Sequence, residues 1–279
     1  MKFRILTFIF GLLLLASCGE YNKVLKNPDL EVKYSYAKNY FALGKFSRSA
    51  TLLEDVVPMF KGSVHAEESL YLLAQSYYGM RDYMTASQYF ASYYNTYPKG
   101  EYTELARYYS AYGLYLDSPD PRLDQTQTYQ SIKQFQDFME YYPQSERKAE
   151  AEMVQFELQE KLALKDLMAV RLYYNLGNYV VGYPFPGGNY SSCVISATGA
   201  LRTYPYSKYR EEFMYYSIRA KYDMALESVK DKKSLRYRDV IDEYYTYIND
   251  FPDGLYVKQI VKIFENSQKQ IEDKQFLEQ

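Results

Sequence analysis

Few side chains in this sequence of 279 residues could carry covalent or metal chemistry, because it contains only two Cys and one His. A single imidazole, His65, excludes a site built on several histidines, and two Cys exclude a four-Cys zinc site or a disulfide framework. The adjacent carboxylates Glu67 and Glu68 do not face each other on a helix, so they predict no acid–base pair. The sequence shows no Gly-rich phosphate loop or nucleophile elbow. We therefore expect no catalytic residue, no metal and no cofactor.

The chemistry that the sequence does favour is acylation of Cys18. Lys2 and Arg4 precede an apolar run over residues 5–16, which is too short to span about 30 Å of hydrocarbon as a helix and is typical of a signal peptide. The run ends in Leu15-Ala16-Ser17-Cys18, which resembles the lipobox of bacterial lipoproteins. In that motif the Cys thiol receives a diacylglyceryl group and becomes the new N-terminus. The alternative is a secretory signal with an incidental Cys.

Acylation of Cys18 would have consequences for the whole chain. We expect a signal peptide over residues 1–17 and a tether over 18–26, and Cys193 would have no disulfide partner. No second apolar run approaches 18 residues, so we expect no transmembrane helix after the signal. The residue after the Cys is Gly19 and not Asp, which resembles lipoproteins sorted to the outer membrane. We interpret the anchor as facing the periplasm.

An aromatic residue followed by Pro recurs along the chain, and each occurrence closes a stretch of helical periodicity. Pro cannot continue a helix and restricts the residue before it, so each pair predicts a helix end. Between these marks apolar residues recur at spacings of three and four, which predict amphipathic helices and not strands. The pairs are Tyr97-Pro98, Tyr142-Pro143, Tyr204-Pro205 and Phe251-Pro252.

The stretch 67–100 is the clearest repeat. Its small residues Ala74 and Ala86 and its large residues Tyr77 and Phe90 resemble the tetratricopeptide pattern, in which small residues let two antiparallel helices pack closely. The stretch 30–63 is a weaker copy, in which Ser49 takes the second small position. Later repeats are longer and carry their excess in the predicted loops 117–122, 182–188 and 229–233 and in a long helix over 146–178.

The periodicity predicts an all-α fold, a right-handed superhelix of about five tetratricopeptide-like helix pairs with a C-terminal capping helix over about 254–274. We expect N-terminal repeats one to three over residues 27–143. Repeats four and five with the capping helix should occupy residues 144–279.

The first helix of each pair should line the concave face of such a superhelix. Tyr rings supply contact area at low entropy cost and their hydroxyls bond a peptide backbone, so the predicted lining suits an extended peptide. With 36 Tyr in the chain, some must lie on a surface, although each single Tyr has core packing as its alternative. The candidates are Tyr34, Lys38 and Phe41 from the first repeat and Glu68, Tyr71, Gln75 and Tyr78 from the second. Tyr108, Tyr112 and Tyr115 are further candidates from the third.

Charge patterning excludes one class of partner. The 33 basic and 35 acidic residues leave no strong positive field, so we expect no nucleic-acid binding. His65 is interpreted as a surface residue near a helix N-terminus, and Cys193 as a small buried side chain.

The combination of a lipobox with five degenerate helix pairs of this spacing resembles the BamD family, also called the YfiO-type or ComL-type lipoproteins, of the β-barrel assembly machinery. The resemblance implies a non-enzymatic scaffold at the periplasmic face of the outer membrane. It implies that the C-terminal repeats bind the periplasmic domain of the barrel-forming subunit. The N-terminal repeats would receive the C-terminal strand of unfolded outer-membrane proteins, and other assembly lipoproteins would be partners. The insertion 181–188 departs from the family pattern.

Two other functions remain open at this stage. One is a different tetratricopeptide lipoprotein scaffold of the envelope. The other is a glycan-handling helical lipoprotein, which the absence of Trp disfavours because sugar platforms favour Trp.

Overall fold

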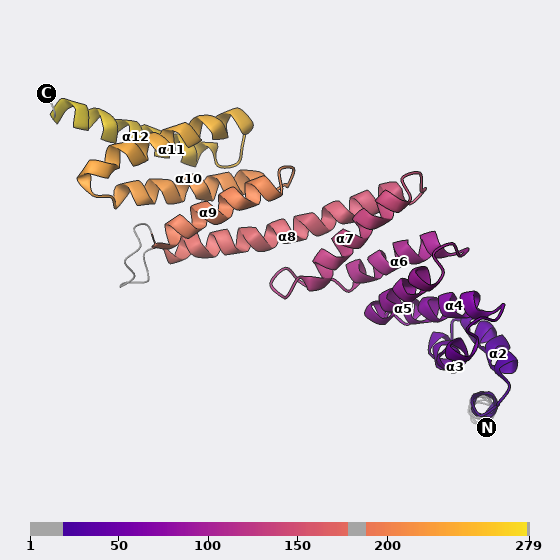
Figure 1. Ribbon diagram of the computed structural model, residues 1–279. Coiled ribbons are helices and arrows are strands. Elements are labelled where there is room, and N and C mark those ends of the chain that lie inside the picture. Colours follow the sequence, from indigo (N-terminus) through magenta and orange to yellow (C-terminus); the bar gives the residue numbers. More distant parts are fainter. Residues whose placement is uncertain (1–18, 178–187, 278–279) are drawn as a thin grey trace, which may run out of the picture. The chain divides into compact units, whose positions relative to one another are not determined.

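The computed structural model describes residues 19–177 and 188–277, with side chains up to residue 272. Every regular element in these ranges is an α-helix (Figure 1), which confirms the all-α prediction. The signal peptide, Cys18 and residues 181–187 of the predicted insertion lie outside the described residues. The chain divides into two compact units, which are described separately.

The N-terminal unit, as far as it is described, comprises residues 19–120 and 124–155. From α2 to α7 each helix packs against the next in chain order, as expected for stacked helix pairs (Figure 1). The predicted loop over 117–122, which contains two Pro, falls between helices. The helices are α2 (Leu30–Ala42), α3 (Phe46–Met59), α4 (Ala66–Gly79), α5 (Tyr83–Thr96), α6 (Thr103–Leu116), α7 (Thr126–Tyr141) and the first turns of α8 (Lys148–Leu176).

The C-terminal unit comprises residues 121–123 and the chain from residue 156 onward. Its core joins Leu167 of α8 to Cys193 of α9 and Phe213 of α10, and α11 and α12 continue the stack. The division between the units lies within the residues of α8, between residues 155 and 156. The predicted boundary after residue 143 stays a prediction. The further helices are α9 (Gly188–Thr203), α10 (Arg210–Leu226), α11 (Lys230–Asp250) and α12 (Val257–Leu277).

One predicted loop is shorter than expected. α11 begins at Lys230, so residues 230–233 belong to its first turn and only 227–229 separate it from α10. The predicted loop 229–233 is therefore corrected. The stretch contains no Gly or Pro that would stop a helix, and Asp231 lies in the first turn, where a carboxylate is favourable.

Small buried residues let the paired helices approach closely. Ser49 of α3 is fully buried, and its hydroxyl donates to the carbonyl of Ala37 in α2 at 2.9 Å. Ser131 of α7 does the same to Ala111 of α6, also at 2.9 Å. A Ser at this position fills the volume of an Ala and satisfies its hydroxyl across the interface. This explains why Ser49 can stand where the repeat pattern has a small apolar residue.

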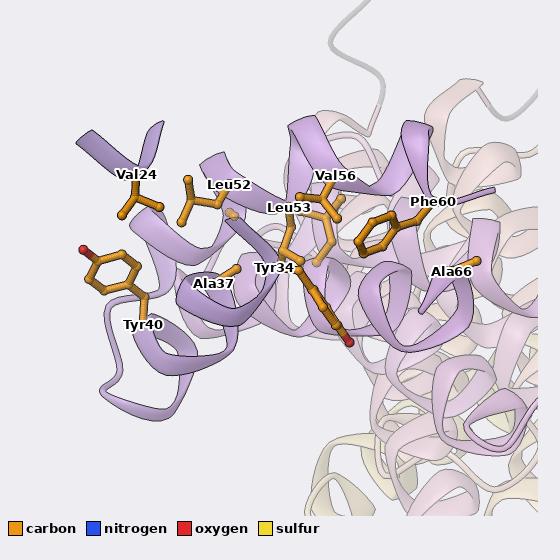
Figure 2. Close-up of a cluster of buried hydrophobic side chains, with 11 residues drawn as sticks. Val24, Tyr34, Ala37, Tyr40, Leu52, Leu53, Val56, Phe60 and Ala66 are labelled. Atoms are coloured by element: carbon orange, nitrogen blue, oxygen red, sulfur yellow. The ribbon is translucent and has the colours of Figure 1, made fainter. Parts of the chain in front are cut away.

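The segment predicted as a tether contains a helix over residues 19–25 that packs on the first repeat. Val24 is buried, and the Tyr21 ring meets the Tyr40 ring edge-on with 5.7 Å between centroids. Figure 2 shows Val24 at one end of the cluster of buried side chains in this repeat. So few residues show no helical periodicity, so only the packing reveals that this segment is folded.

A carboxylate in the first turn of a first helix holds each clear repeat boundary together. Glu67 of α4 accepts a hydrogen bond from the Tyr93 hydroxyl of α5 and one from the backbone N–H of Glu101, at 2.7 Å. The Tyr93 hydroxyl also accepts from the N–H of Tyr102 at 3.1 Å. Gly100 stands in the same turn because a Cβ there would collide with the Glu67 carboxylate. The Glu67 carboxylate thus fixes α5, the turn and the start of α6.

The C-terminal unit repeats this arrangement with other residues. Glu211 of α10 accepts from the Tyr247 hydroxyl of α11 at 2.6 Å and from the N–H of Tyr256 at 3.2 Å. Gly254 again occupies the position where a Cβ would meet the carboxylate. We call Glu67 and Glu211 the boundary carboxylates. The pairs Tyr97-Pro98 and Phe251-Pro252, which the sequence predicts as helix ends, therefore each lead into a turn that is hydrogen-bonded to a boundary carboxylate.

We predict that Tyr93→Phe destabilises the protein by about 2 kcal/mol, because it removes a buried hydrogen bond to a charged acceptor. Tyr247→Phe should have a similar effect in the C-terminal unit. Urea unfolding followed by circular dichroism measures both. The control is Tyr129→Phe, whose ring is exposed and whose loss of a hydroxyl should cost less than about 0.5 kcal/mol. An equal cost for Tyr93→Phe and Tyr129→Phe would refute the role of the boundary carboxylate.

Candidate functional site

Three Tyr occupy the same place in successive first helices, 37 residues apart, and all three are buried. Tyr34, Tyr71 and Tyr108 have exposures of 4%, 6% and 1%. Tyr34 packs edge-on against Phe60 at 5.5 Å between centroids, and Tyr108 packs in the same way against Phe138 at 5.6 Å. The predicted place of Tyr34 and Tyr108 on an open groove wall is therefore corrected. The side chains of Tyr34 and Tyr108 fill the space between neighbouring helices.

The positions four and seven residues further along these helices are more accessible. Gln75 and Tyr78 are half-buried on α4, and Lys38 is exposed and Phe41 half-buried at the equivalent places on α2. Positions four and seven residues apart lie near one face of a helix, so these side chains share the face of the preceding Tyr but sit one and two turns further along it. They form the part of the predicted lining that reaches solvent.

Two pockets open along α4 and share Gln75. The first, of about 200 Å³, has Phe41, Phe46, Tyr78 and Tyr109 among its walls. The Tyr78 and Tyr109 rings meet edge-on with 5.4 Å between centroids. The complete lining is Phe41, Phe46, Gln75, Tyr78, Gly79, Phe90 and Tyr109. Five aromatic rings and one amide make a mainly apolar site with a polar group beside it.

The second pocket, of about 250 Å³, lies between α4 and the start of α6. Tyr71 forms its floor, stacked on Tyr102 with 4.4 Å between centroids and 11° between planes. Glu68 and Gln75 supply its polar groups. The complete lining is Glu68, Tyr71, Leu72, Gln75, Tyr102 and Leu105. Together the two pockets form what we call the α4 groove, which is built entirely within the N-terminal unit.

The predicted residues thus divide into two sets. Those that line the α4 groove are Phe41, Glu68, Tyr71, Gln75 and Tyr78. Lys38 and Tyr34 border it through contacts with Glu68 and with each other, because the Lys38 ammonium lies 5.2 Å from the Tyr34 ring centre and 2.8 Å from a Glu68 carboxylate oxygen.

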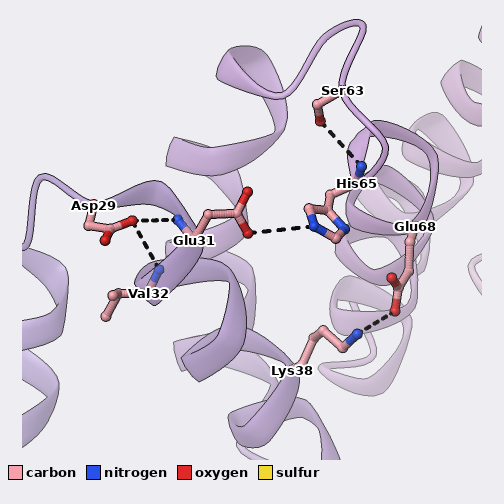
Figure 3. A network of polar contacts seen from close by, with 7 residues as sticks. All are labelled: Asp29, Glu31, Val32, Lys38, Ser63, His65 and Glu68. Carbon is pink, nitrogen blue, oxygen red and sulfur yellow. Dashed lines mark hydrogen bonds and ion pairs between the residues drawn. The ribbon is translucent and has the colours of Figure 1, made fainter.

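Charge at the groove is balanced at neutral pH. Lys38 lowers the pKa of the Glu68 carboxyl, so this pair is ionised, and Figure 3 shows it reaching from α2 to α4. Burial raises the pKa of Tyr71 and of Tyr78 to about 12, so their hydroxyls stay neutral and can donate hydrogen bonds. The Arg147 guanidinium lies 5.5 Å from the Tyr109 ring centre and brings a cation beside the wall. The groove therefore offers rings, an amide and neutral hydroxyls to a ligand.

Sequence reasoning missed the groove residues that come from the helices beside α4. Leu105 of α6 stands at the position equivalent to Glu68 of α4, and Tyr109 stands one position beyond the equivalent of Tyr71. Both residues line the pockets beside α4. Phe46 and Phe90 come from second helices, which were expected to lie behind the groove. A wall between two helices takes residues from both, which a single-helix pattern does not capture.

His65 and Cys193, which the sequence singles out as possible reactive groups, both pack against other side chains. The His65 ring lies between Tyr34 and Phe60, at 5.1 and 5.7 Å, and 3.6 Å from a Glu31 carboxylate oxygen (Figure 3). It is thus more enclosed than the surface residue that we predicted. Cys193 is fully buried as predicted, and burial raises the pKa of its thiol to about 12. The described residues contain no group of three or more His, Cys, Asp or Glu placed to hold a metal ion.

Comparison with known proteins identifies one family. Residues 28–182, more than half of the chain, match the model of the YfiO family, which is described as outer membrane lipoprotein. No curated protein matches the sequence. Within the part of the chain that the structure describes, no helix combines the length and apolar character that crossing a membrane requires. The matched range contains every residue of the α4 groove.

We predict that Lys38→Met raises the pKa of Glu68 toward its ordinary value, because it removes the cation that lowers it. A carboxyl with a lowered folded-state pKa stabilises the protein above its unfolded pKa, and this contribution is lost as the pH falls through the folded pKa. Lys38→Met should therefore flatten the loss of stability in the acid range, below about pH 4.5. NMR titration of the Glu carboxyl carbons measures the shift. Lys61→Met, an exposed Lys in a loop, is the control, and equal titration curves in both variants would contradict the prediction.

Proposed function

The chain belongs to the YfiO family of outer membrane lipoproteins, and from this premise we propose that it is a non-catalytic scaffold of the β-barrel assembly machinery. The observation that carries the proposal is the α4 groove, an aromatic binding surface within the matched residues whose one carboxylate, Glu68, is paired with Lys38. Such a surface suits an extended peptide and offers no set of groups for catalysis.

The anchor is the first part of this proposal. The signal peptide over residues 1–17 is removed, Cys18 is acylated, and the lipid holds the folded chain at the periplasmic face of the outer membrane. The lipobox pattern and the family description support this assignment. Several acyl chains on one Cys bind a membrane stably, whereas one chain alone binds only marginally.

The α4 groove is proposed to receive the C-terminal strand of unfolded outer-membrane proteins. An extended strand directs alternate side chains to one side, so two aromatic side chains of the strand can enter two neighbouring pockets. Gln75, shared by both pockets, is placed to bond the strand backbone between them. The Tyr71 and Tyr78 hydroxyls are neutral donors for further backbone carbonyls.

The C-terminal unit is proposed to bind the barrel-forming subunit, with other assembly lipoproteins as further partners. Its first-helix surface combines aromatic rings with cations that can contact another protein. The Arg219 guanidinium lies 4.4 Å from the Tyr174 ring centre and donates to the Tyr215 hydroxyl at 2.9 Å. Arg and Tyr are the residue types most enriched at the centres of protein interfaces.

We predict that a photoreactive residue in place of Gln75 crosslinks to a synthetic peptide ending in the C-terminal strand of a barrel protein. Gln75 is the better position than Tyr71, because Tyr71 forms a buried floor whose replacement would disturb the stack on Tyr102. The matched control is a photoreactive residue at Tyr129, which is exposed on α7 and lines neither pocket. The adduct should also disappear with Tyr78→Ala.

An adduct at Gln75 and Tyr129 alike would mean nonspecific adhesion of an aromatic peptide. Labelling of neighbouring helices alone at Gln75 would show that the groove does not receive the strand. A scrambled peptide of the same composition separates the effect of order from that of hydrophobicity.

We predict that the tagged chain, purified from detergent-solubilised envelope, brings down the barrel-forming subunit as identified by mass spectrometry. Arg219→Ala with Tyr174→Ala should reduce its recovery several-fold, because both side chains lie on the proposed contact surface. Tyr78→Ala in the α4 groove serves as the control and should leave recovery unchanged. Recovery of division or secretion proteins in its place would favour the alternative of another envelope scaffold.

A further inference from the structure

The helix over residues 19–25 packs at one end of the N-terminal unit, beside the turn that connects α2 and α3. We call this turn, residues 43–45, the first tip, and the turn between α4 and α5, residues 80–82, the second tip. The Arg48 guanidinium lies 5.1 Å from the Tyr21 ring centre and 5.7 Å from that of Tyr40, so it joins this segment to the repeat. Figure 2 shows Val24 and Tyr40 at one end of the buried cluster and Phe60 toward the other. The point where the chain enters the described domain is therefore beside the tip that connects α2 and α3.

Exposed aliphatic side chains and cations alternate at the first two tips. Leu43, which follows α2, is 59% exposed, and Met80, which follows α4, is 39% exposed. Lys45 stands two residues after Leu43 and Arg81 directly follows Met80, and both are exposed. An open depression of about 460 Å³ is lined by residues 44–48 and by Met80, so the two tips form one continuous surface.

One of these cations stands where the backbone favours Gly. Arg81 has φ 63°, and the equivalent residue of the first tip is Gly44 with φ 69°. A side chain in the left-handed region costs free energy that Gly avoids. The strain itself only raises the question of function, but it leaves an exposed Arg in the second tip, next to an exposed Met.

The surroundings of the tips are positively charged. Lys23 and Lys26, both exposed, add two cations from the segment before α2. Glu20 and Asp82 belong to the same segments, where they accept from the Tyr36 hydroxyl at 3.2 Å and from a backbone N–H of α5. These two acids offset only part of the charge of Lys23, Lys26, Lys45, Arg48 and Arg81. Cations with exposed aliphatic side chains match the interface of a bilayer that contains anionic lipid.

We propose that this N-terminal tip surface lies against a bilayer containing anionic phospholipid, with Leu43 and Met80 at the headgroup level. The inference rests on the proposed acylation of Cys18, which directly precedes the packed segment and so brings the acyl chains close to the tips. The anchored domain would then have a fixed orientation on the membrane, since two kinds of contact hold it. The surface consists of Leu43, Lys45, Arg48, Met80 and Arg81.

The test reconstitutes the full lipid-bearing chain into vesicles and measures the depth of a fluorophore attached to Leu43→Cys. The native Cys193 is fully buried and does not compete for the label. Val64→Cys is the matched control, because Val64 is 89% exposed in the loop after α3, at the other end of the first repeat. Vesicles are made of phosphatidylethanolamine with phosphatidylglycerol or of phosphatidylcholine alone, each with a lipid-attached quencher.

We expect several-fold stronger quenching at position 43 than at position 64 in vesicles with phosphatidylglycerol, and a weaker difference in phosphatidylcholine. Arg81→Gly with Lys45→Gln should reduce quenching at position 43 without loss of folding, because Gly relieves the strained backbone. Equal quenching at both positions, or none at position 43 on vesicles that carry the chain, would overturn the inference while leaving the anchor intact. Failure of the chain to float with vesicles would refute the anchor itself and this inference with it.

Discussion

A Tyr hydroxyl inside a protein needs a hydrogen-bond partner, and at three places this chain supplies a carboxylate. Tyr93 and Tyr247 donate to the boundary carboxylates Glu67 and Glu211, and Tyr174 donates to Asp223 at 2.7 Å. The boundary carboxylates also accept from the turn that leads to the next helix pair. One carboxylate therefore ties together two helices and the path to a third, which constrains where the next repeat can begin.

The same constraint prepares the surface on which we base the proposed function. Because the turn at Gly100 is held by Glu67, Tyr102 is brought over Tyr71 and the two rings stack at 4.4 Å. The stack forms the floor of one pocket of the α4 groove. In the C-terminal unit the turn at Gly254 brings Tyr256 onto Tyr215 at 4.0 Å in the same way. Interior packing and binding surface are consequences of one hydrogen-bonded turn.

Periodicity and Pro marks were enough to predict the helices, because an amphipathic helix must repeat every three to four residues whatever its neighbours. The turn after Gly79 and the long helix α8 follow from such local rules. The burial of Tyr34 and Tyr108 could not be predicted from the sequence. Their repeat position and that of Tyr78, seven residues further along, carry the same periodic pattern and differ only in which neighbouring helix they contact. The fold of residues 19–25 was missed for the same reason, because its stability comes from contacts with Tyr40 and Arg48 and not from its own sequence.

The two units share a framework but differ in charge at one decisive position. Glu68 with Lys38 in the N-terminal unit corresponds to Glu212 with Arg171 in the C-terminal unit, where the ions are 2.6 Å apart. Eight residues after the boundary carboxylate stands Gln75 in the first case and Arg219 in the second. Gln75 leaves an uncharged amide between two pockets, whereas the Arg219 guanidinium lies across the rings of Tyr174 and Tyr215. A neutral amide suits an apolar strand of varied sequence, and a cation fixed on rings suits one partner with complementary charge. A difference at one equivalent position is therefore enough to distinguish the two binding roles that we propose.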